Sequence, residues 1–527
     1  MKVLVSDNIS EMGLEILKKS GLDVDVKPGM NADELKSCIA GYDGIVIRSA
    51  TKLTADVIEL AEKLKVIGRA GSGLDNVDKA AATKKGIVVM NTPGGNTITT
   101  AEHTIALLFS IARKIPHATQ SMKDGKWEKK KFMGVELFNK TLGILGIGNI
   151  GAQVAKRAIG LEMNVVGYDP FLSEETAMKL GIKKVSLDEL FKESDFITVH
   201  TPMTPETKYV INEQSIAKMK KGVRLINCAR GGIVDEKALY DAIKSGKVAA
   251  AALDVFEKEP PADLSLIALD EVVCTPHLGA STMEAQENVA LAVAEQVADY
   301  LVNGTIRNAV NFPSIPQDKV GILKPYIDLA GRMGAFASQL VEHEVREINI
   351  ELTGEASEIP EAAVVIAAVK GYLSPILEET VNFVNAPLIA KERGIDVKVT
   401  KSADSGAYST MLTLKIKCDS TEHIFSGTLF SKKDPRIIRI NNYSLELIPE
   451  GYMLFINNND KPGVIGSIGM LLGESGINIA RMSFGRESKG GMAVSVVSVD
   501  EDISSTIMGK IRNLPNILSV KKITIDM

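Results

Sequence analysis

The 527-residue chain has little cysteine, little charge imbalance and no long apolar run. Its four cysteines, Cys38, Cys228, Cys274 and Cys418, lie far apart and form no CxxC pair. We therefore expect neither a disulfide framework nor a metal site, and we interpret them as small buried thiols of a reducing compartment. A formal net charge of −5 argues against a nucleic-acid surface that depends on bulk positive charge. No apolar run reaches the ~18 residues of a membrane span.

Composition and length are those of a multidomain globular protein. Hydrophobic residues make up 45% and charged residues 24% of the sequence, and at ~100–200 residues per domain we expect three or four domains. The first residues reach an acid, Asp7, too soon for a signal peptide. These features predict a cytoplasmic protein.

Two stretches alternate strand and helix patterns. In the first, up to about residue 98, short β-branched runs such as 44–47 and 88–90 alternate with helical patterns such as 9–19 and 32–39. The alternation restarts at Thr141 and continues to about residue 280. Such alternation predicts parallel sheets with helices on both faces.

Two long helical patterns flank the second stretch. Thr99 and Glu102 have capping-box spacing before a helix expected at 101–115. Ser281 and Glu284 have the same spacing before a second helix, which Gly304 should end. The flanking helices favour insertion of the second unit into the first, although the pattern alone also allows two units in tandem.

The rest of the chain has a different pattern. From residue 311 to about 449, strands with period-two alternation, such as 346–352 and 411–416, surround two helical patterns near 360–388. This arrangement predicts a separate α+β domain. Residues 452–527 then follow the β-α-β-β-α-β order of the ferredoxin-like fold, which is common in small-molecule-sensing modules.

The most specific motif is a GxGxxG sequence formed by Gly146, Gly148 and Gly151. It follows an apolar strand pattern, opens a helix, and precedes a second strand that ends at Asp169. This is the context of a dinucleotide site, in which the glycines allow a tight turn, close approach of the pyrophosphate and close helix packing. Asp169 is placed to bind the adenosine ribose and to repel a 2′-phosphate. No Lys or Arg follows at 170–173, so NAD is favoured over NADP.

Three polar residues each follow an apolar strand pattern downstream. They are Arg230, Glu259 and His277. A guanidinium can grip a carboxylate through two hydrogen bonds, a histidine can take the proton of a hydroxyl, and a carboxylate can fix the histidine tautomer. Each residue alone could instead be a surface or structural group, but together behind a dinucleotide motif they predict a 2-hydroxyacid dehydrogenase.

The motifs resemble those of the D-isomer-specific 2-hydroxyacid dehydrogenase family. The resemblance rests on GIGNIG at 146–151, NCARGG at 227–232, ALDVFEKEPP at 252–261 and TPHLGAST at 275–282. Further matching segments are 47–51, 69–76, 91–93 and 125–127. The resemblance extends over essentially the whole chain, and within the family it is to long members that carry an intervening domain and a regulatory ACT domain.

This resemblance implies a fold and a set of domain boundaries. The fold class is α/β, with a Rossmann-type nucleotide domain inserted in a flavodoxin-like substrate domain, followed by an α+β intervening domain and a ferredoxin-like βαββαβ ACT domain. We expect a discontinuous substrate domain at 1–98 and 284–310 and a nucleotide domain at 99–283. The intervening, allosteric substrate-binding domain should span 311–449, and the ACT domain 450–527.

The resemblance also implies roles for single residues. His277 is the expected proton donor and acceptor, Glu259 its partner and Arg230 the carboxylate anchor. The expected NAD contacts are Gly146, Gly148, Asn149, Ile150, Gly151, Asp169, Thr201, Cys228, Ala229, Arg230, Asp254, His277, Leu278, Gly279 and Ala280. The expected substrate contacts are Arg48, Ser49, Ser72, Gly73, Asn96, Lys129 and Arg230. For Arg48 an ion pair between domains, and for Lys129 a solvated loop, remain as alternatives.

The implied activity is NAD-dependent oxidation of 3-phospho-D-glycerate to 3-phosphohydroxypyruvate, the first step of phosphorylated L-serine synthesis. L-serine is then an expected effector of the ACT domain, with Asn459, Gly463 and Asn478 as candidate contacts. An ACT domain used only for assembly is the alternative. The family also implies a homodimer or homotetramer. Two other functions stay open, namely a reductase for another 2-oxo acid and an NAD-sensing binding protein.

Overall fold

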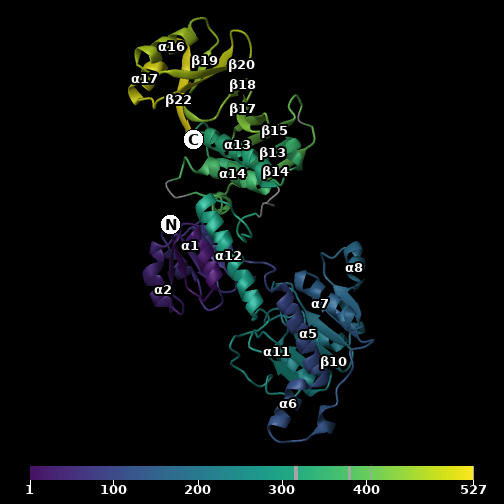
Figure 1. Ribbon diagram of the computed structural model, residues 1–527. Helices are drawn as coiled ribbons and strands as arrows, with labels where there is room; N and C mark the ends of the chain where they lie inside the picture. The colour runs from purple at the N-terminus through teal and green to yellow at the C-terminus, as the bar shows by residue number, and fades with distance from the viewer. Residues whose placement is uncertain (314–318, 378–380, 405, 526–527) are drawn as a thin grey trace.

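The computed structural model describes residues 1–313, 319–377, 381–404 and 406–525 (Figure 1). Its strands form four separate sheets of five, seven, six and four strands. In the described part of the chain, no helix is both long and apolar enough to cross a membrane. The α/β class expected from the sequence is confirmed.

The first sheet is parallel and has the order β2-β1-β3-β4-β5. Its central strands consist of buried apolar residues, as expected for strands covered on both faces. Its strands are β1 (Lys2–Val5), β2 (Asp23–Val26), β3 (Gly44–Ile47), β4 (Val66–Arg69) and β5 (Val88–Met90), and the helices between them are α1 (Glu11–Lys19), α2 (Ala32–Cys38), α3 (Ala55–Glu59) and α4 (Lys79–Lys84).

The long helix α12 (Met283–Asn303) brings the chain back to this first unit. It packs on α1 and β4, and two glycines make room for it. A Cβ at Gly13 would lie 3.0 Å from the carbonyl oxygen of Ala290, and one at Gly68 would lie 2.5 Å from Val297 Cγ2. The second α/β unit is therefore inserted in the first, which excludes the tandem arrangement.

The inserted unit contains the second sheet, with the order β12-β11-β10-β9-β6-β7-β8, all parallel. The carboxyl ends of its strands therefore lie along one edge, where such sheets bind ligands. Its strands are β6 (Thr141–Leu145), β7 (Asn164–Tyr168), β8 (Lys183–Lys184), β9 (Phe196–Val199), β10 (Val223–Asn227), β11 (Val248–Leu253) and β12 (Val272–Cys274). Its helices are α5 (Thr97–Arg113), α6 (Ile115–Lys123), α7 (Asn149–Gly160), α8 (Glu174–Leu180), α9 (Leu187–Glu193), α10 (Glu213–Lys218) and α11 (Glu236–Lys244), with a 3-10 turn, η2 (Lys129–Phe132).

Both predicted capping boxes are wrong in detail. Helix α5 begins two residues before Thr99, and Glu102 instead lies 3.1 Å from Arg157 on α7. The cap of α12 is Thr282 rather than Ser281, because the Thr282 hydroxyl accepts the hydrogen bond from the Ala285 N–H. A neighbouring hydroxyl and an interhelical ion pair thus replaced the expected local contacts.

The third sheet has the order β14-β13-β15-β16-β17-β18, and only the pair β13–β14 is parallel. Sequence analysis did not identify its longest helix, α13, although apolar residues recur along it at helical spacing. The elements are α13 (Val320–Ser338), β13 (Val345–Gly354), η4 (Glu355–Glu358), α14 (Ala362–Leu373), α15 (Ala386–Glu392), β14 (Asp396–Ser402), β15 (Thr410–Cys418), β16 (Glu422–Phe430), β17 (Asp434–Ile440) and β18 (Tyr443–Leu447).

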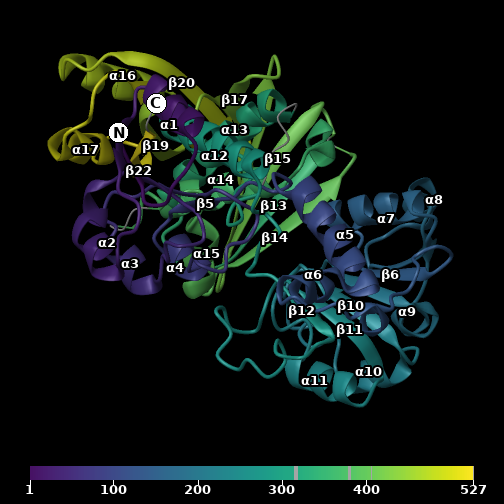
Figure 2. The same ribbon diagram turned by 60° about the horizontal axis from the view of Figure 1, so that its bottom comes forward.

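The fourth sheet is antiparallel and has the ferredoxin-like order β20-β21-β19-β22. One of its faces shares a hydrophobic core with α13, where Phe336 makes edge-to-face contacts with Phe425 and Phe455. Figures 1 and 2 show this unit at the end of the molecule far from the nucleotide unit. Its elements are β19 (Gly451–Asn459), α16 (Val464–Glu474), β20 (Ile479–Arg486), β21 (Met492–Val499), α17 (Ser505–Arg512) and β22 (Ile517–Ile525).

The cysteines are not uniformly buried, which corrects the sequence-based interpretation. Cys228 and Cys418 are buried, but Cys38 is half-buried and Cys274 is exposed. Cys274 ends β12, where the strand leaves the core for the loop that carries His277. The apolar strand pattern could not show that its last residue turns outward.

Candidate active site

The GxGxxG motif forms the turn between β6 and α7. Gly146 has φ +95°, and a Cβ there would lie 2.7 Å from the His200 carbonyl oxygen. A Cβ at Gly151 would lie 2.1 Å from the Gly146 carbonyl oxygen, whereas one at Gly148 would meet no atom within 4 Å. The first and third glycines are thus required by the fold, and the second leaves open space at the start of α7, which begins at Asn149.

Asp169 lies beside this turn, at the end of β7. One of its carboxylate oxygens accepts a 2.9 Å hydrogen bond from the Ile147 N–H, and the other accepts a 2.8 Å bond from the Phe171 N–H. These bonds fix the carboxylate next to the glycine turn. That is the position expected for the acid that recognises a ribose.

The predicted catalytic histidine and acid form a close pair. His277 Nδ1 lies 2.8 Å from Glu259 Oε2, and the second oxygen of Glu259 accepts a 3.2 Å bond from the Phe256 N–H. A carboxylate at Nδ1 favours the tautomer with its proton on that nitrogen and leaves Nε2 free to accept a proton. His277 itself has φ +56°, a left-handed conformation that is uncommon for residues other than glycine.

The His277 loop is fixed by a buried carboxylate, that of Asp254, which is 1% exposed. It accepts hydrogen bonds from the Leu278 N–H at 2.7 Å and the Gly279 N–H at 2.8 Å. The Thr275 hydroxyl donates a third bond at 2.6 Å, and His103 Nε2 lies 3.2 Å from the same carboxylate. Burial raises the pKa of Asp254, but these hydrogen bonds outweigh burial and bring the net pKa below its ordinary value.

Arg230 follows β10 and extends toward the first α/β unit. Its Nε lies 3.2 Å from Asp75 Oδ2, and its Nη1 donates a 2.6 Å bond to the Ala229 carbonyl. A Cβ at Gly73 would lie 2.4 Å from Arg230 Nη2, so the guanidinium packs directly against the backbone of the 71–73 turn. Ser72, Gly73 and Arg230 therefore meet across the boundary between the two α/β units.

Twelve of the predicted catalytic, cofactor and substrate residues line one cleft of about 440 Å³ between these units. Those that line it are Ser72, Gly73, Asn96, Ile150, Thr201, Cys228, Ala229, Arg230, Asp254, His277, Gly279 and Ala280. Thr201 Oγ1 is buried there and has no hydrogen-bond partner among the residues that the structure describes. An unpaired buried hydroxyl beside the glycine turn fits a site that is completed by a polar ligand.

Sequence reasoning missed Arg69 as a candidate site residue. Its Nε is buried with no hydrogen-bond partner in the described part of the chain. Burial, followed by the positive charge of Arg230 and that of Arg48, lowers the pKa of Arg69. Arg69 ends strand β4, so the rule that identified Arg230, a polar residue just after an apolar run, could have found it.

Three predicted substrate contacts lie outside the lining of the cleft. Arg48 follows β3, with its N–H 2.5 Å from Asp7 Oδ2 and its Nη1 donating to the Asn8 carbonyl at 3.3 Å. Ser49 is exposed. Lys129 lies on the exposed turn η2, beyond α6, and the cleft of its own chain does not include it.

The three candidate effector contacts are not adjacent within one chain. Asn459 ends β19, and Gly463, with φ +93°, precedes the first turn of α16. Asn478 follows the other end of α16, where its side chain donates a 2.6 Å bond to Asp500. Because α16 separates Gly463 from Asn478, these residues can share a ligand only if two copies of the domain come together.

Two groups near the cleft have strongly shifted pKa values. Burial lowers the pKa of His200 to about 3, so this histidine is neutral at physiological pH. Its Nε2 lies 3.0 Å from the Thr198 hydroxyl. Burial also raises the pKa of Cys228 to about 12, which keeps this thiol protonated and unreactive.

Comparison with known proteins finds related sequences along the whole length of the chain. Residues 105–279 match the NAD binding domain of D-isomer specific 2-hydroxyacid dehydrogenases, 322–441 match the D-3-phosphoglycerate dehydrogenase intervening domain, and 452–516 match the ACT domain. The chain is 45% identical to the D-3-phosphoglycerate dehydrogenase of Methanocaldococcus jannaschii over all of both chains. The chain belongs to the D-3-phosphoglycerate dehydrogenase family.

A further member of this family and two solved dehydrogenase structures are also similar to the chain. The D-3-phosphoglycerate dehydrogenase of Bacillus subtilis is 42% identical over 99% of both chains. A D-lactate dehydrogenase of Aquifex aeolicus, solved with NAD and lactic acid, is 29% identical with a TM-score of 0.53 and covers 60% of this chain and 100% of its own. A glyoxylate reductase of Paecilomyes thermophila is 32% identical with a TM-score of 0.55, covering 59% and 98%. The chain is therefore an NAD-binding dehydrogenase with two further domains.

Proposed function

We propose that the chain oxidises 3-phospho-D-glycerate to 3-phosphohydroxypyruvate with NAD, the first step of phosphorylated L-serine synthesis in the cytoplasm. The observation that carries this proposal is that His277, whose Nδ1 is paired with Glu259, lines one cleft together with Arg230 and with Ile150, which follows the glycine turn. An NAD-sensing protein can keep the same fold and the same three residues, so the feature that argues against this alternative is the ACT domain, which regulation of a biosynthetic step explains better. The relatives of full length are named for this reaction.

The cofactor site is proposed from the residues around the glycine turn. The open space above Gly148 admits a pyrophosphate, and the first N–H groups of α7 at Asn149 and Ile150 can donate to it. Asp169 accepts from the ribose hydroxyls, and Thr201 offers the unpaired hydroxyl described above. When bound, NAD supplies the acceptor for the hydride that leaves C2 of the substrate.

The chain's own residues orient the substrate and move the proton. We assign Arg230 to the substrate carboxylate. The carboxylate would replace Asp75 at the guanidinium and accept two parallel hydrogen bonds from it. His277 Nε2 accepts the proton of the C2 hydroxyl, and Glu259 stabilises the imidazolium that forms. In the reverse direction the same nitrogen returns that proton to the carbonyl oxygen.

The substrate phosphate calls for positive charge beyond Arg230. Arg69 is assigned to this role because its Nε has no partner in the described chain and its charge is close enough to that of Arg230 to lower its pKa. Arg48 adds a third guanidinium beside it. A 2-hydroxy acid with an uncharged side chain would bind Arg230 through its carboxylate but would offer no anion to Arg69 and Arg48, which favours a phosphorylated substrate over the unphosphorylated acids.

We propose a homodimer or homotetramer. Lys129 is outside the cleft of its own chain, so contact with substrate requires that η2 extend to the cleft of a second copy. The neighbouring side chains Trp127 and Met133 are each 80% exposed, and exposed apolar groups of this size are typical of association surfaces. The same pairing of copies would allow Gly463 and Asn478 of different ACT domains to share one L-serine, which is the proposed feedback inhibitor.

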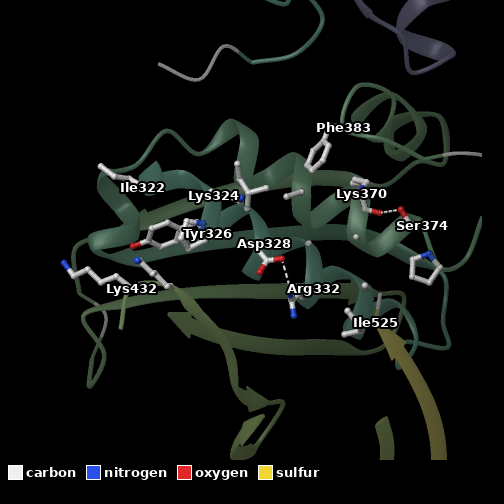
Figure 3. Close-up of a pocket in the computed structure, with 18 of the residues that line it drawn as sticks. Ile322, Lys324, Tyr326, Asp328, Arg332, Lys370, Ser374, Phe383, Lys432 and Ile525 are labelled. Carbon is white, nitrogen blue, oxygen red and sulfur yellow. Dashed lines mark hydrogen bonds and ion pairs between the residues drawn. The ribbon is translucent and has the colours of Figure 1, made fainter. Parts of the chain in front are cut away.

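The intervening domain has a large hollow of about 1420 Å³ between α13 and α14 (Figure 3). Lys432 is paired with Glu355 and Arg332 with Asp328. For Lys324, Lys370 and Lys433, which also line the hollow, the described structure records no carboxylate partner. We propose this hollow as the anion-binding site of the intervening domain. We also propose that the domain boundaries are those expected from the sequence.

The test of the assigned chemistry is the substitution His277→Ala. Turnover of 3-phosphoglycerate should fall by about 10²–10⁴, because no group then takes the proton, whereas calorimetric NAD affinity should be unchanged. Turnover that stays near the wild-type value would contradict the role of His277. Loss of NAD binding in the variant would also contradict this role, because the lost turnover would then come from the cofactor site rather than from proton transfer.

A further inference from the structure

Helix α5 begins where the two α/β units join, and its first residues contact both. Asn96 is the residue just before the helix, and Thr100 lies one turn into it. Thr100 is 3% exposed and Asn96 is half-buried. The chemistry assigned above gives neither residue a role, although the sequence analysis names Asn96 as an expected substrate contact.

These residues belong to one directed chain of hydrogen bonds. The Ser72 hydroxyl donates to Asn96 Oδ1 at 3.3 Å, and Asn96 Nδ2 donates to the Thr100 hydroxyl at 3.2 Å. The Thr100 hydroxyl then donates to the Gly279 carbonyl at 2.8 Å. Each group accepts from the one before and donates to the next, so the bonds polarise one another in the same direction.

The two ends of this chain are the two halves of the active site. Ser72 lies in the turn that contacts Arg230, and its carbonyl is also held by Asn91 Nδ2 at 2.7 Å. Gly279 lies two residues after His277, and its N–H is fixed by Asp254 at 2.8 Å. The peptide groups of Gly279 are therefore fixed on both sides, its carbonyl by Thr100 and its N–H by Asp254.

We propose that Asn96 and Thr100 are positioning residues that link the substrate-binding turn to the His277 loop. In this role they act through the Gly279 carbonyl, to which the Thr100 hydroxyl donates. This relay, formed by Ser72, Asn96, Thr100 and Gly279, links the position of the His277 loop to that of the 71–73 turn. When the two units approach, His277 is therefore already placed relative to the substrate-binding turn. This inference rests on the proposed function, because it assigns His277 to proton transfer.

The test compares two substitutions at Thr100, one that keeps its shape and one that keeps its hydroxyl, with a control on the same helix. Thr100→Val removes the hydroxyl and should lower kcat about five- to tenfold, the effect of one lost hydrogen bond. Thr100→Ser keeps the hydroxyl and should stay within about twofold. The control is Thr104→Val, because the buried Thr104 hydroxyl donates to the Thr100 carbonyl inside the helix and not to the loop. It should lower the melting temperature as much as Thr100→Val without the loss in kcat.

A double-mutant cycle tests the far end of the relay. If Ser72 also acts through Asn96 and Thr100, the loss in kcat caused by Ser72→Ala should be smaller in the Thr100→Val background than in the wild type, by the part of the effect that passes through the relay. Full additivity of the two losses would overturn the relay. Should Thr100→Val fail to fold, Asn96→Ala replaces it in the same comparison, since the half-buried Asn96 is the preceding member.

A second readout does not depend on turnover. Hydrogen exchange measured by mass spectrometry on peptides covering 275–282 should be about three- to tenfold faster in Thr100→Val than in Thr104→Val, because the loop has lost one tie. Equal exchange in the two variants would overturn the proposal. If the wild type does not turn over 3-phosphoglycerate, the proposed function fails, and the exchange experiment still decides whether Thr100 positions the loop.

Discussion

His277 Nδ1 lies 2.8 Å from Glu259 Oε2, and no other carboxylate is recorded at that nitrogen in the described chain. Both side chains are partly open to solvent, at 47% and 40% exposure. The pair is therefore placed by its surroundings, namely the Phe256 N–H on Glu259 and the Asp254 carbonyl on the His277 N–H, 2.9 Å away. Its contribution is to catalysis rather than to the stability of the fold, because an exposed ion pair adds little to stability.

Replacing Glu259 by glutamine should therefore slow the chemistry and leave the fold intact. We expect kcat to fall about 10- to 100-fold, because the imidazolium loses its counter-charge, with NAD affinity and melting temperature unchanged. Glu257→Gln is the matched control, since this exposed acid bonds Tyr209 and not His277. Steady-state kinetics of both variants checks the prediction, and equal losses would contradict it.

The glycines of the motif should separate binding from folding. Gly148→Ala places a methyl group in open space, so the melting temperature should be retained while NAD binds more weakly. Gly151→Ala places its methyl group 2.1 Å from the Gly146 carbonyl oxygen, and should destabilise the nucleotide unit by about 1–3 kcal/mol. Calorimetric NAD titration and thermal unfolding measure the two effects. Equal behaviour of the two variants would contradict this division of roles.

The cysteines should differ in reactivity. Cys274 is exposed, whereas burial raises the pKa of Cys228 to about 12. Iodoacetamide at pH 8 should therefore label Cys274 in the native protein and reach Cys228 only after unfolding. Mass spectrometry of tryptic peptides identifies the labelled sites. Native labelling of Cys228 before Cys274 would show that the structure assigns their burial wrongly.

His200 should make the nucleotide unit sensitive to acid. Its pKa is about 3 in the folded protein but about 6.5 in an unfolded chain. Below pH 6.5 the unfolded chain takes up a proton that the folded protein does not, so stability falls as pH falls. Between pH 7 and pH 5 the loss should be about 2 kcal/mol.

The measurement is thermal unfolding of the wild type and of His200→Gln over this pH range. The variant lacks the titrating group, so its melting temperature should depend less on pH. A steeper dependence in the variant than in the wild type would contradict the assignment of a neutral, half-buried histidine at position 200.

The sequence predicted the parts of the fold that follow from the burial and alignment of parallel strands. The strand-turn-helix around Gly146 and the polar residues after β10, β11 and β12 follow from the burial of parallel strands and the common edge at their carboxyl ends. The start of α5 was missed because Thr99 and Glu102 have capping spacing but no capping contact. Glu102 has a better partner in Arg157, which is 55 residues away in sequence.

Contacts between distant segments could not be read from the sequence in the same way. The pattern placed Arg230 at the edge of a sheet, but only the structure shows that its guanidinium packs against Gly73 and that Arg69, whose Nε has no partner in the described chain, packs against Gly71 of the same turn. The separation of Gly463 from Asn478 is a second example, since both loops fit the ACT motif and only the length of α16 between them shows that one chain cannot bring them together.

The most direct test of the central claim is the substrate preference of the wild-type protein. NADH formation is followed at alkaline pH with a product trap, comparing kcat/KM for 3-phosphoglycerate and for D-glycerate. The account predicts a strong preference for the phosphorylated acid, because Arg69 and Arg48 supply positive charge beyond Arg230 that the phosphate would pair with and that D-glycerate, which has only the carboxylate, would not. Equal or reversed preference, or no turnover of either acid despite tight NAD binding, would contradict it.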